Sequence, residues 1–269
     1  MPPLDYRQWL LALITTMLSV LTYALPEEVV VVGAAPEKIE NHVGALLDVS
    51  IDDQISRWND PICLRVVGLT QDYIELLTAS LRPAANTVRI TVADEGCNPN
   101  LLVFFTGNAV ETTQGIANHF GLAMRQAGQR RLQQFLDSEA PIRWISTFDP
   151  CGFGCRLANS RIIASSAPSV QRMWVVVDLT KIQMRPFQNI THFISFVALT
   201  NPSAAQETTL PSILDLFDDA ADGKTLQGLT MYDEVYLDAL YSVPMDRYAK
   251  QQQGAISARM LTRLNELSR

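Results

Sequence analysis

The stretch Leu101-Leu102-Val103-Phe104-Phe105 is continuously apolar and lies between Pro99 and Gly107. A short apolar run of this kind, bounded by turn-forming residues, is typical of a strand that is buried on both faces. Further strands are expected at Val88–Val92, Ile142–Phe148, Arg161–Ser165 and Met173–Leu179. The middle of the chain is therefore expected to supply a sheet.

Helical patterns lie on both sides of these strands. Apolar residues recur at three- and four-residue spacing behind Pro36, and again over Tyr73–Leu81, where Pro83 is expected to end the helix. The segment Ala109–Leu136 is expected to be helical, with an interruption near Gly128.

Every strong signal from Pro186 onward is helical. The chain thus opens with strands interleaved with helices, gathers strands in its middle and finishes with helices, which is an α+β pattern. We expect one mixed or antiparallel sheet packed against helices, with a helical C-terminal third.

The sharpest helical pattern begins at Thr230. Its hydroxyl is placed to cap a helix while Asp233 reaches back, which makes a variant capping box. Tyr232 and Tyr236 fall on the apolar face of this helix. We interpret both tyrosines as core residues, and the alternative is that they line a pocket together with Thr191 and His192.

The N-terminus predicts export. Arg7 precedes a mostly apolar run, Trp9–Leu21, and then Thr22-Tyr23-Ala24, which is typical of a signal peptide over residues 1–24 that is cleaved after Ala24. The run is shorter than the about 20 apolar residues of a membrane span, so no stable span is expected after cleavage. Residues 25–269 are then expected to form a single domain, periplasmic or secreted, with an uncleaved N-terminal anchor as the alternative.

Composition argues against nucleic acid as a partner. The formal net charge is −7, and the densest basic cluster is only Arg125, Arg130 and Arg131. Phosphate backbones would be repelled by such a surface. An apolar content of 48% supports a sizeable core.

The four cysteines, Cys63, Cys97, Cys151 and Cys155, form an even set, which in an exported chain favours disulfides. Of the three possible pairings we expect Cys63 with Cys97 and Cys151 with Cys155, because the two glycines of Cys151-Gly-Phe-Gly-Cys155 allow a tight turn. Closing a loop of about 35 residues between the first pair stabilises the fold by roughly 3 to 4 kcal/mol. A four-cysteine zinc site is the alternative.

Catalytic templates do not fit this chain. His42, His119 and His192 are never three or four residues from one another, so the two-histidine helix face of zinc hydrolases is missing, and no Gly-x-Ser-x-Gly elbow occurs. Asp222-Gly223-Lys224-Thr225 has Asp218 where a phosphate loop needs glycine, and the same stretch lacks calcium ligands. We therefore expect no metal and no cofactor.

Asn189-Ile190-Thr191 matches a glycosylation acceptor. Its neighbours suggest a helix, which argues against a glycan there.

The segment Leu229–Tyr241 resembles the ending of uncharacterised secreted bacterial families with a zincin-like fold. In those families a helix with a His-Glu-x-x-Gln or His-Glu-x-x-His motif comes first, and the comparable stretch here is Thr191-His192-Phe193-Ile194-Ser195. The resemblance places Thr191 and Ser195 at metal-ligand positions and His192 at the general-base position. None of the three is the residue that a zinc hydrolase needs there.

The front half resembles uncharacterised exported proteins of Alphaproteobacteria. The residues that carry this resemblance are Arg57–Cys63, Val67–Leu69 and Cys97–Leu101.

These observations favour a non-catalytic binding or scaffold protein of the bacterial cell envelope, stabilised by disulfides and descended from a zincin-like metallohydrolase, whose partner is an envelope protein or a peptide. The alternative is an active, peptidase-like hydrolase that uses His192, Ser195 and a carboxylate such as Asp178 or Glu207. A third interpretation is a structural protein that uses its surface only for assembly. The expectation leans against an enzyme.

Overall fold

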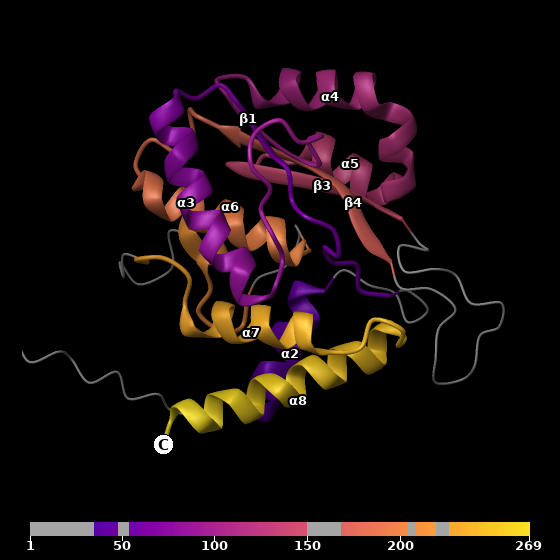
Figure 1. Cartoon of the computed structure of the whole chain (residues 1–269), viewed down its shortest axis with the longest axis vertical. Coiled ribbons are helices and arrows are strands. Elements are labelled where there is room, and N and C mark those ends of the chain that lie inside the picture. Colours follow the sequence, from indigo (N-terminus) through magenta and orange to yellow (C-terminus); the bar gives the residue numbers. More distant parts are fainter. Residues whose placement is uncertain (1–34, 48–53, 150–167, 204–207, 219–225) are drawn as a thin grey trace, which may run out of the picture. The chain divides into compact units, whose positions relative to one another are not determined.

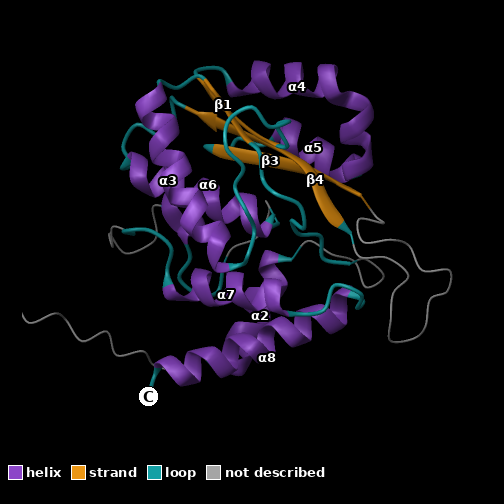
Figure 2. Cartoon of the chain, in the orientation of Figure 1, coloured by secondary structure: helices purple, strands orange, loops and turns teal. Residues whose placement is uncertain are grey.

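A mixed sheet forms the centre of the described part of the chain (Figures 1 and 2). The computed structural model describes residues 35–47, 54–149, 168–203, 208–218 and 226–269, all within a unit that begins at Gly33. The sheet has the strand order β1-β2-β4-β3. Its strands are β1 (Leu64–Val67), β2 (Leu101–Thr106), β3 (Ile142–Asp149) and β4 (Ser169–Asp178).

Three of these strands are parallel and the fourth is not. β2 pairs in parallel with β1 on one side and with β4 on the other, whereas β3 runs antiparallel along the outer edge of β4. The expected strands at 101–105, 142–148 and 173–179 are confirmed within one to four residues at their ends. The expected strand at 161–165 lies outside the described residues.

Helices cover both faces of the sheet. They are α2 (Pro36–Leu46), α3 (Gln71–Thr87), α4 (Ala109–Met124), α5 (Gln129–Asp137), α6 (Phe187–Thr200), α7 (Met231–Ser242) and α8 (Ala249–Leu267), with 3₁₀ helices η1 (Arg125–Ala127) and η2 (Ile213–Phe217). Gly128, which has φ +93°, separates α4 and η1 from α5, so the expected interruption is confirmed.

Each face of the sheet has its own apolar cluster. Side chains of α4 and α5 pack on the face that carries Trp174 and Val176. On the other face, Val103 and Val175 contact the larger cluster, which extends through α3 and α6 to α7, α2 and α8 (Figure 1). The expectation of an α+β fold with one mixed sheet and a helical C-terminal third is confirmed.

Two expectations near α3 are wrong. The helix does not end at Pro83 but continues to Thr87. Proline removes one hydrogen bond to the carbonyl of Ala79, and because both residues are exposed, water can satisfy that carbonyl. Buried Leu81 and Ala85 hold the helix on either side.

Residues 88–92 form no strand of the sheet. Val88, Ile90 and Val92 are buried as an alternating pattern predicts, but Arg89 adopts φ +64° and the N–H of Ile90 donates to the carbonyl of Ala85 at the end of α3. Only Val92 makes an isolated bridge, to Ile62. The short edge strand β1 was not predicted.

The disulfide between Cys63 and Cys97 is confirmed, with Cα atoms 5.9 Å apart. It joins the residue before β1 to the loop before β2. Cys151 and Cys155 lie outside the described residues. Within the described ranges, no helix has the length and apolarity needed to cross a bilayer.

Candidate functional site

Helix α6 carries the stretch Thr191–Ser195, and it is almost wholly enclosed: eleven of its fourteen residues are buried. The hydroxyl of Thr191 donates to the carbonyl of Gln188 over 2.7 Å, and the hydroxyl of Ser195 donates to the carbonyl of Thr191 over 2.7 Å. Both side chains are at most 1% exposed. Their hydroxyl groups therefore bond to the backbone of their own helix.

His192 is the half-buried member of this stretch and meets a residue of α3. Its Nδ1 lies 3.4 Å from Oγ of Ser80, and the same Oγ lies 3.2 Å from Oγ of Ser195. α3 packs along α6, which brings the three side chains together (Figure 1). Ser80 is 112 residues from His192 in the sequence, and no spacing or motif pointed to it.

Burial lowers the pKa of His192, which favours the neutral imidazole. Its Nε2 faces the loop before α7, where a Cβ built on Gly228 would lie 3.4 Å away. Gly228 also has φ +137°, which side chains disfavour. A glycine at this position thus allows the loop to lie against the histidine ring.

The cluster of Ser80, His192 and Ser195 has a hydroxyl beside a base, and the described part of the chain supplies no acid that orients this base. Asp178 accepts hydrogen bonds from Thr180, 3.0 Å from the backbone nitrogen and 2.6 Å from the hydroxyl. Among the described residues, no carboxylate forms a hydrogen bond or ion pair with His192. Glu207 lies outside them.

The two tyrosines of α7 occupy different surroundings. Tyr236 is fully buried in the large core, with its ring centroid 6.2 Å from that of Phe196 and 6.5 Å from that of His42. Burial raises the pKa of Tyr236. Tyr232 is partly buried against the same core. Among the residues that the structure describes, neither tyrosine forms a hydrogen bond to Thr191 or His192.

Asp233 is the most heavily bonded acid of this region. The capping box with Thr230 is confirmed, because the Thr230 hydroxyl accepts from the Asp233 N–H over 3.1 Å and the Asp233 carboxylate accepts from the Thr230 N–H over 2.8 Å. The carboxylate also accepts from the Ser212 hydroxyl over 2.6 Å and from the Ile213 N–H over 2.8 Å. Burial raises its pKa to about 6, although these bonds act in the opposite direction. Asp233 thus ties the start of α7 to the start of η2.

Asn189, the asparagine of the glycosylation pattern, is buried in α6. Its side-chain amide donates to the carbonyl of Leu226. A buried and bonded amide is not presented for glycan attachment.

Comparisons with known proteins add no assignment. The chain matches no family model, no curated protein and no solved structure.

Proposed function

We propose that this protein is an exported, non-catalytic binding protein of the bacterial cell envelope, derived from a zincin-like metallohydrolase. Export follows from the pattern of residues 1–24, and the disulfide between Cys63 and Cys97 is consistent with an oxidising compartment. Its partner is a protein or peptide.

The enclosure of Thr191 and Ser195 carries this proposal. A zinc hydrolase needs about three protein ligands and an open position for water on the metal. Here both hydroxyl groups donate to carbonyls of α6, and Ser80 lies against Ser195. Both hydroxyl groups that the resemblance would make metal ligands are thus already bonded within the fold.

A zinc titration tests the proposal. The purified full-length protein is dialysed against zinc and its bound metal is measured. We expect no stoichiometric zinc. Tight binding of one zinc per chain that is lost in His192→Ala would contradict a non-catalytic role.

The second candidate function is a hydrolase, and the specific observation in its favour is the 3.4 Å approach of Ser80 Oγ to His192 Nδ1. A serine beside a neutral imidazole is the start of a nucleophile and base pair. A panel of peptide and ester substrates, assayed with the wild type, Ser80→Ala and His192→Ala, separates the two functions. Equal background rates in all three support binding, whereas turnover that disappears in both variants establishes the hydrolase.

A further inference from the structure

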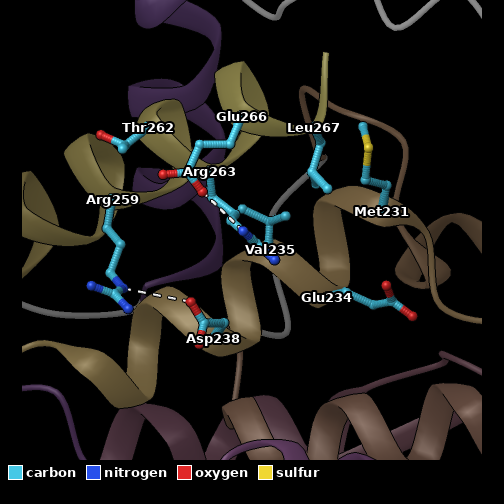
Figure 3. Close-up of a pocket in the computed structure, with 9 residues that line it drawn as sticks. All are labelled: Met231, Glu234, Val235, Asp238, Arg259, Thr262, Arg263, Glu266 and Leu267. Atoms are coloured by element: carbon cyan, nitrogen blue, oxygen red, sulfur yellow. Dashed lines mark hydrogen bonds and ion pairs between the residues drawn. The ribbon is translucent and has the colours of Figure 1, made fainter. Parts of the chain in front are cut away.

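The two C-terminal helices enclose a groove of about 480 Å³ (Figure 3). α7 and α8 pack against each other and are joined by the turn that follows Ser242. The residues that line the groove come from the first two thirds of α7 and the second half of α8, towards the ends remote from that turn. The groove is thus a gap between the far ends of a helical hairpin.

The floor of this α7–α8 groove is apolar. Val235 is buried at its base, Met231 is partly buried, and Leu267 in the last turn of α8 is 48% exposed. Figure 3 shows Met231 and Leu267 facing each other across the opening. From Met231 to Asp238 the groove follows α7 for about 10 Å, which matches about two turns of another helix.

Charges surround the floor, and one of them has no partner. Asp238 pairs with Arg259 across the groove over 3.5 Å, and Arg263 pairs with Glu266 over 2.9 Å. Glu234 is exposed beside Met231, and its carboxylate forms no hydrogen bond or ion pair with any residue that the structure describes. The groove therefore combines an apolar floor with a single uncompensated carboxylate.

We propose that the α7–α8 groove binds a basic, amphipathic helix of a partner protein, an inference that rests on the binding function proposed above. Apolar residues of that helix cover Met231, Val235 and Leu267, as amphipathic helices do in grooves between helices. A lysine or arginine of the partner pairs with Glu234, so the free carboxylate sets the sign of the charge that is accepted.

A pair of model peptides tests the charge preference. One is a fluorescein-labelled amphipathic helix of leucine and lysine, of about 18 residues, and the other carries glutamate in place of each lysine. Fluorescence anisotropy with the full-length protein measures the binding of both. We expect the lysine peptide to bind and the glutamate peptide to bind at least about tenfold more weakly. Equal binding of the two peptides, or no binding of the lysine peptide, would overturn the inference.

Two pairs of variants locate the binding. Glu234→Lys is expected to weaken binding of the lysine peptide about tenfold, whereas Glu95→Lys, which makes the same change of net charge at an exposed loop far along the chain, leaves it within about twofold. Thr262→Trp fills the groove and is expected to abolish binding, whereas Ala255→Trp, at an exposed position of α8 outside it, does not. An equal effect within either pair rejects the groove as the binding site.

Whether the bound peptide is cleaved distinguishes a failure of the groove inference from a failure of the proposed non-catalytic function. Mass spectrometry after long incubation is expected to find the lysine peptide intact. Cleavage of the peptide would contradict the non-catalytic function, while the anisotropy of the four variants would still decide where the peptide binds.

Discussion

His42 illustrates how one buried side chain can link stability to pH. It is fully buried in α2, its Nδ1 accepts the N–H of Leu210 over 3.4 Å, and burial lowers its pKa from 6.5 to about 4. Between these two values the unfolded chain holds a proton on this histidine and the folded chain does not. The contribution of His42 to stability is therefore complete above pH 6.5 and is lost as the pH falls toward 4.

We predict that His42→Asn removes this acid sensitivity. The asparagine oxygen can take the place of Nδ1 as acceptor for Leu210, but it does not titrate. The difference in unfolding free energy between wild type and variant is expected to change by about 3 kcal/mol between pH 7 and pH 4, in favour of the variant at acid pH. Urea unfolding across this range measures it. The matched control is His119→Asn, an exposed residue of α4, and an equal change in this control would reject the assignment.

The titration of Asp233 is predicted to change stability with pH in the direction opposite to that of His42. Because its folded pKa of about 6 lies above the usual 3.8, the folded chain holds a proton that the unfolded chain has lost, and stability falls as the pH rises from 3.8 to 6. Asp233→Asn should remove this loss of about 3 kcal/mol, although it also alters three hydrogen bonds at all pH values. The slope of unfolding free energy against pH, not its absolute value, is the measurement. Asp60→Asn, at an exposed position, is the matched control, and an equal change of slope in it would reject the assignment to Asp233.

Gly228 is predicted to tolerate no side chain. An alanine there would combine an unfavourable φ of +137° with a contact of 3.4 Å to His192 Nε2. Gly228→Ala is expected to destabilise the protein by about 1 to 3 kcal/mol. The same change at Gly254, in the exposed middle of α8 with open space around it, should stabilise by about 0.5 to 1 kcal/mol. Thermal unfolding of the two variants should therefore shift in opposite directions, and a shift of the same sign in both would contradict the role of Gly228.

At the scale of elements, α3 lies in a segment whose two ends are joined covalently. The disulfide between Cys63 and Cys97 closes a loop of 34 residues that contains β1 and the whole of α3. We predict that the double variant Cys63→Ser with Cys97→Ser loses about 3 to 4 kcal/mol of unfolding free energy. Denaturant unfolding of the oxidised wild type and the variant checks this value. A loss below about 1 kcal/mol would mean that packing alone holds this region.

Some elements were predictable from sequence and others were not, for identifiable reasons. The apolar run of β4 is buried on both faces, and that of β2 is buried on one face and partly buried on the other, so their composition alone marks both strands. β1 has only four residues with two of them exposed, which leaves no pattern to recognise. The pattern at 88–92 correctly predicts which side chains are buried, but a strand also needs a pairing partner, and Arg89 turns the backbone away from one.

The candidate site was predictable only where its parts are close in sequence. The cap formed by Thr230 and Asp233 spans three residues, so its spacing is visible in the sequence. Ser80 meets His192 only because α3 packs on α6, and no local signal encodes that contact. The α7–α8 groove depends on how two helices part at their far ends, which periodicity does not report.

At the scale of the whole molecule, the slopes expected of His42 and Asp233 nearly cancel. One raises stability with pH between about 4 and 6.5, and the other lowers it between 3.8 and about 6. These two contributions offset each other over most of this window, so each single variant is expected to show the slope of the group that remains. For the exported protein that we propose, such a balance would limit how far these two groups change stability with acidity.

The enclosure of α6 has a consequence for biosynthesis. Its outer side is covered by α7, where Phe196 meets Tyr236 and the hydroxyl of Tyr241 bonds to the carbonyl of Leu199. A polypeptide is synthesised from its N-terminus, so the apolar helix α6 is made before α7, which covers it. Until α7 has been synthesised, the apolar surface of α6 that it covers stays exposed, which favours aggregation of the nascent chain.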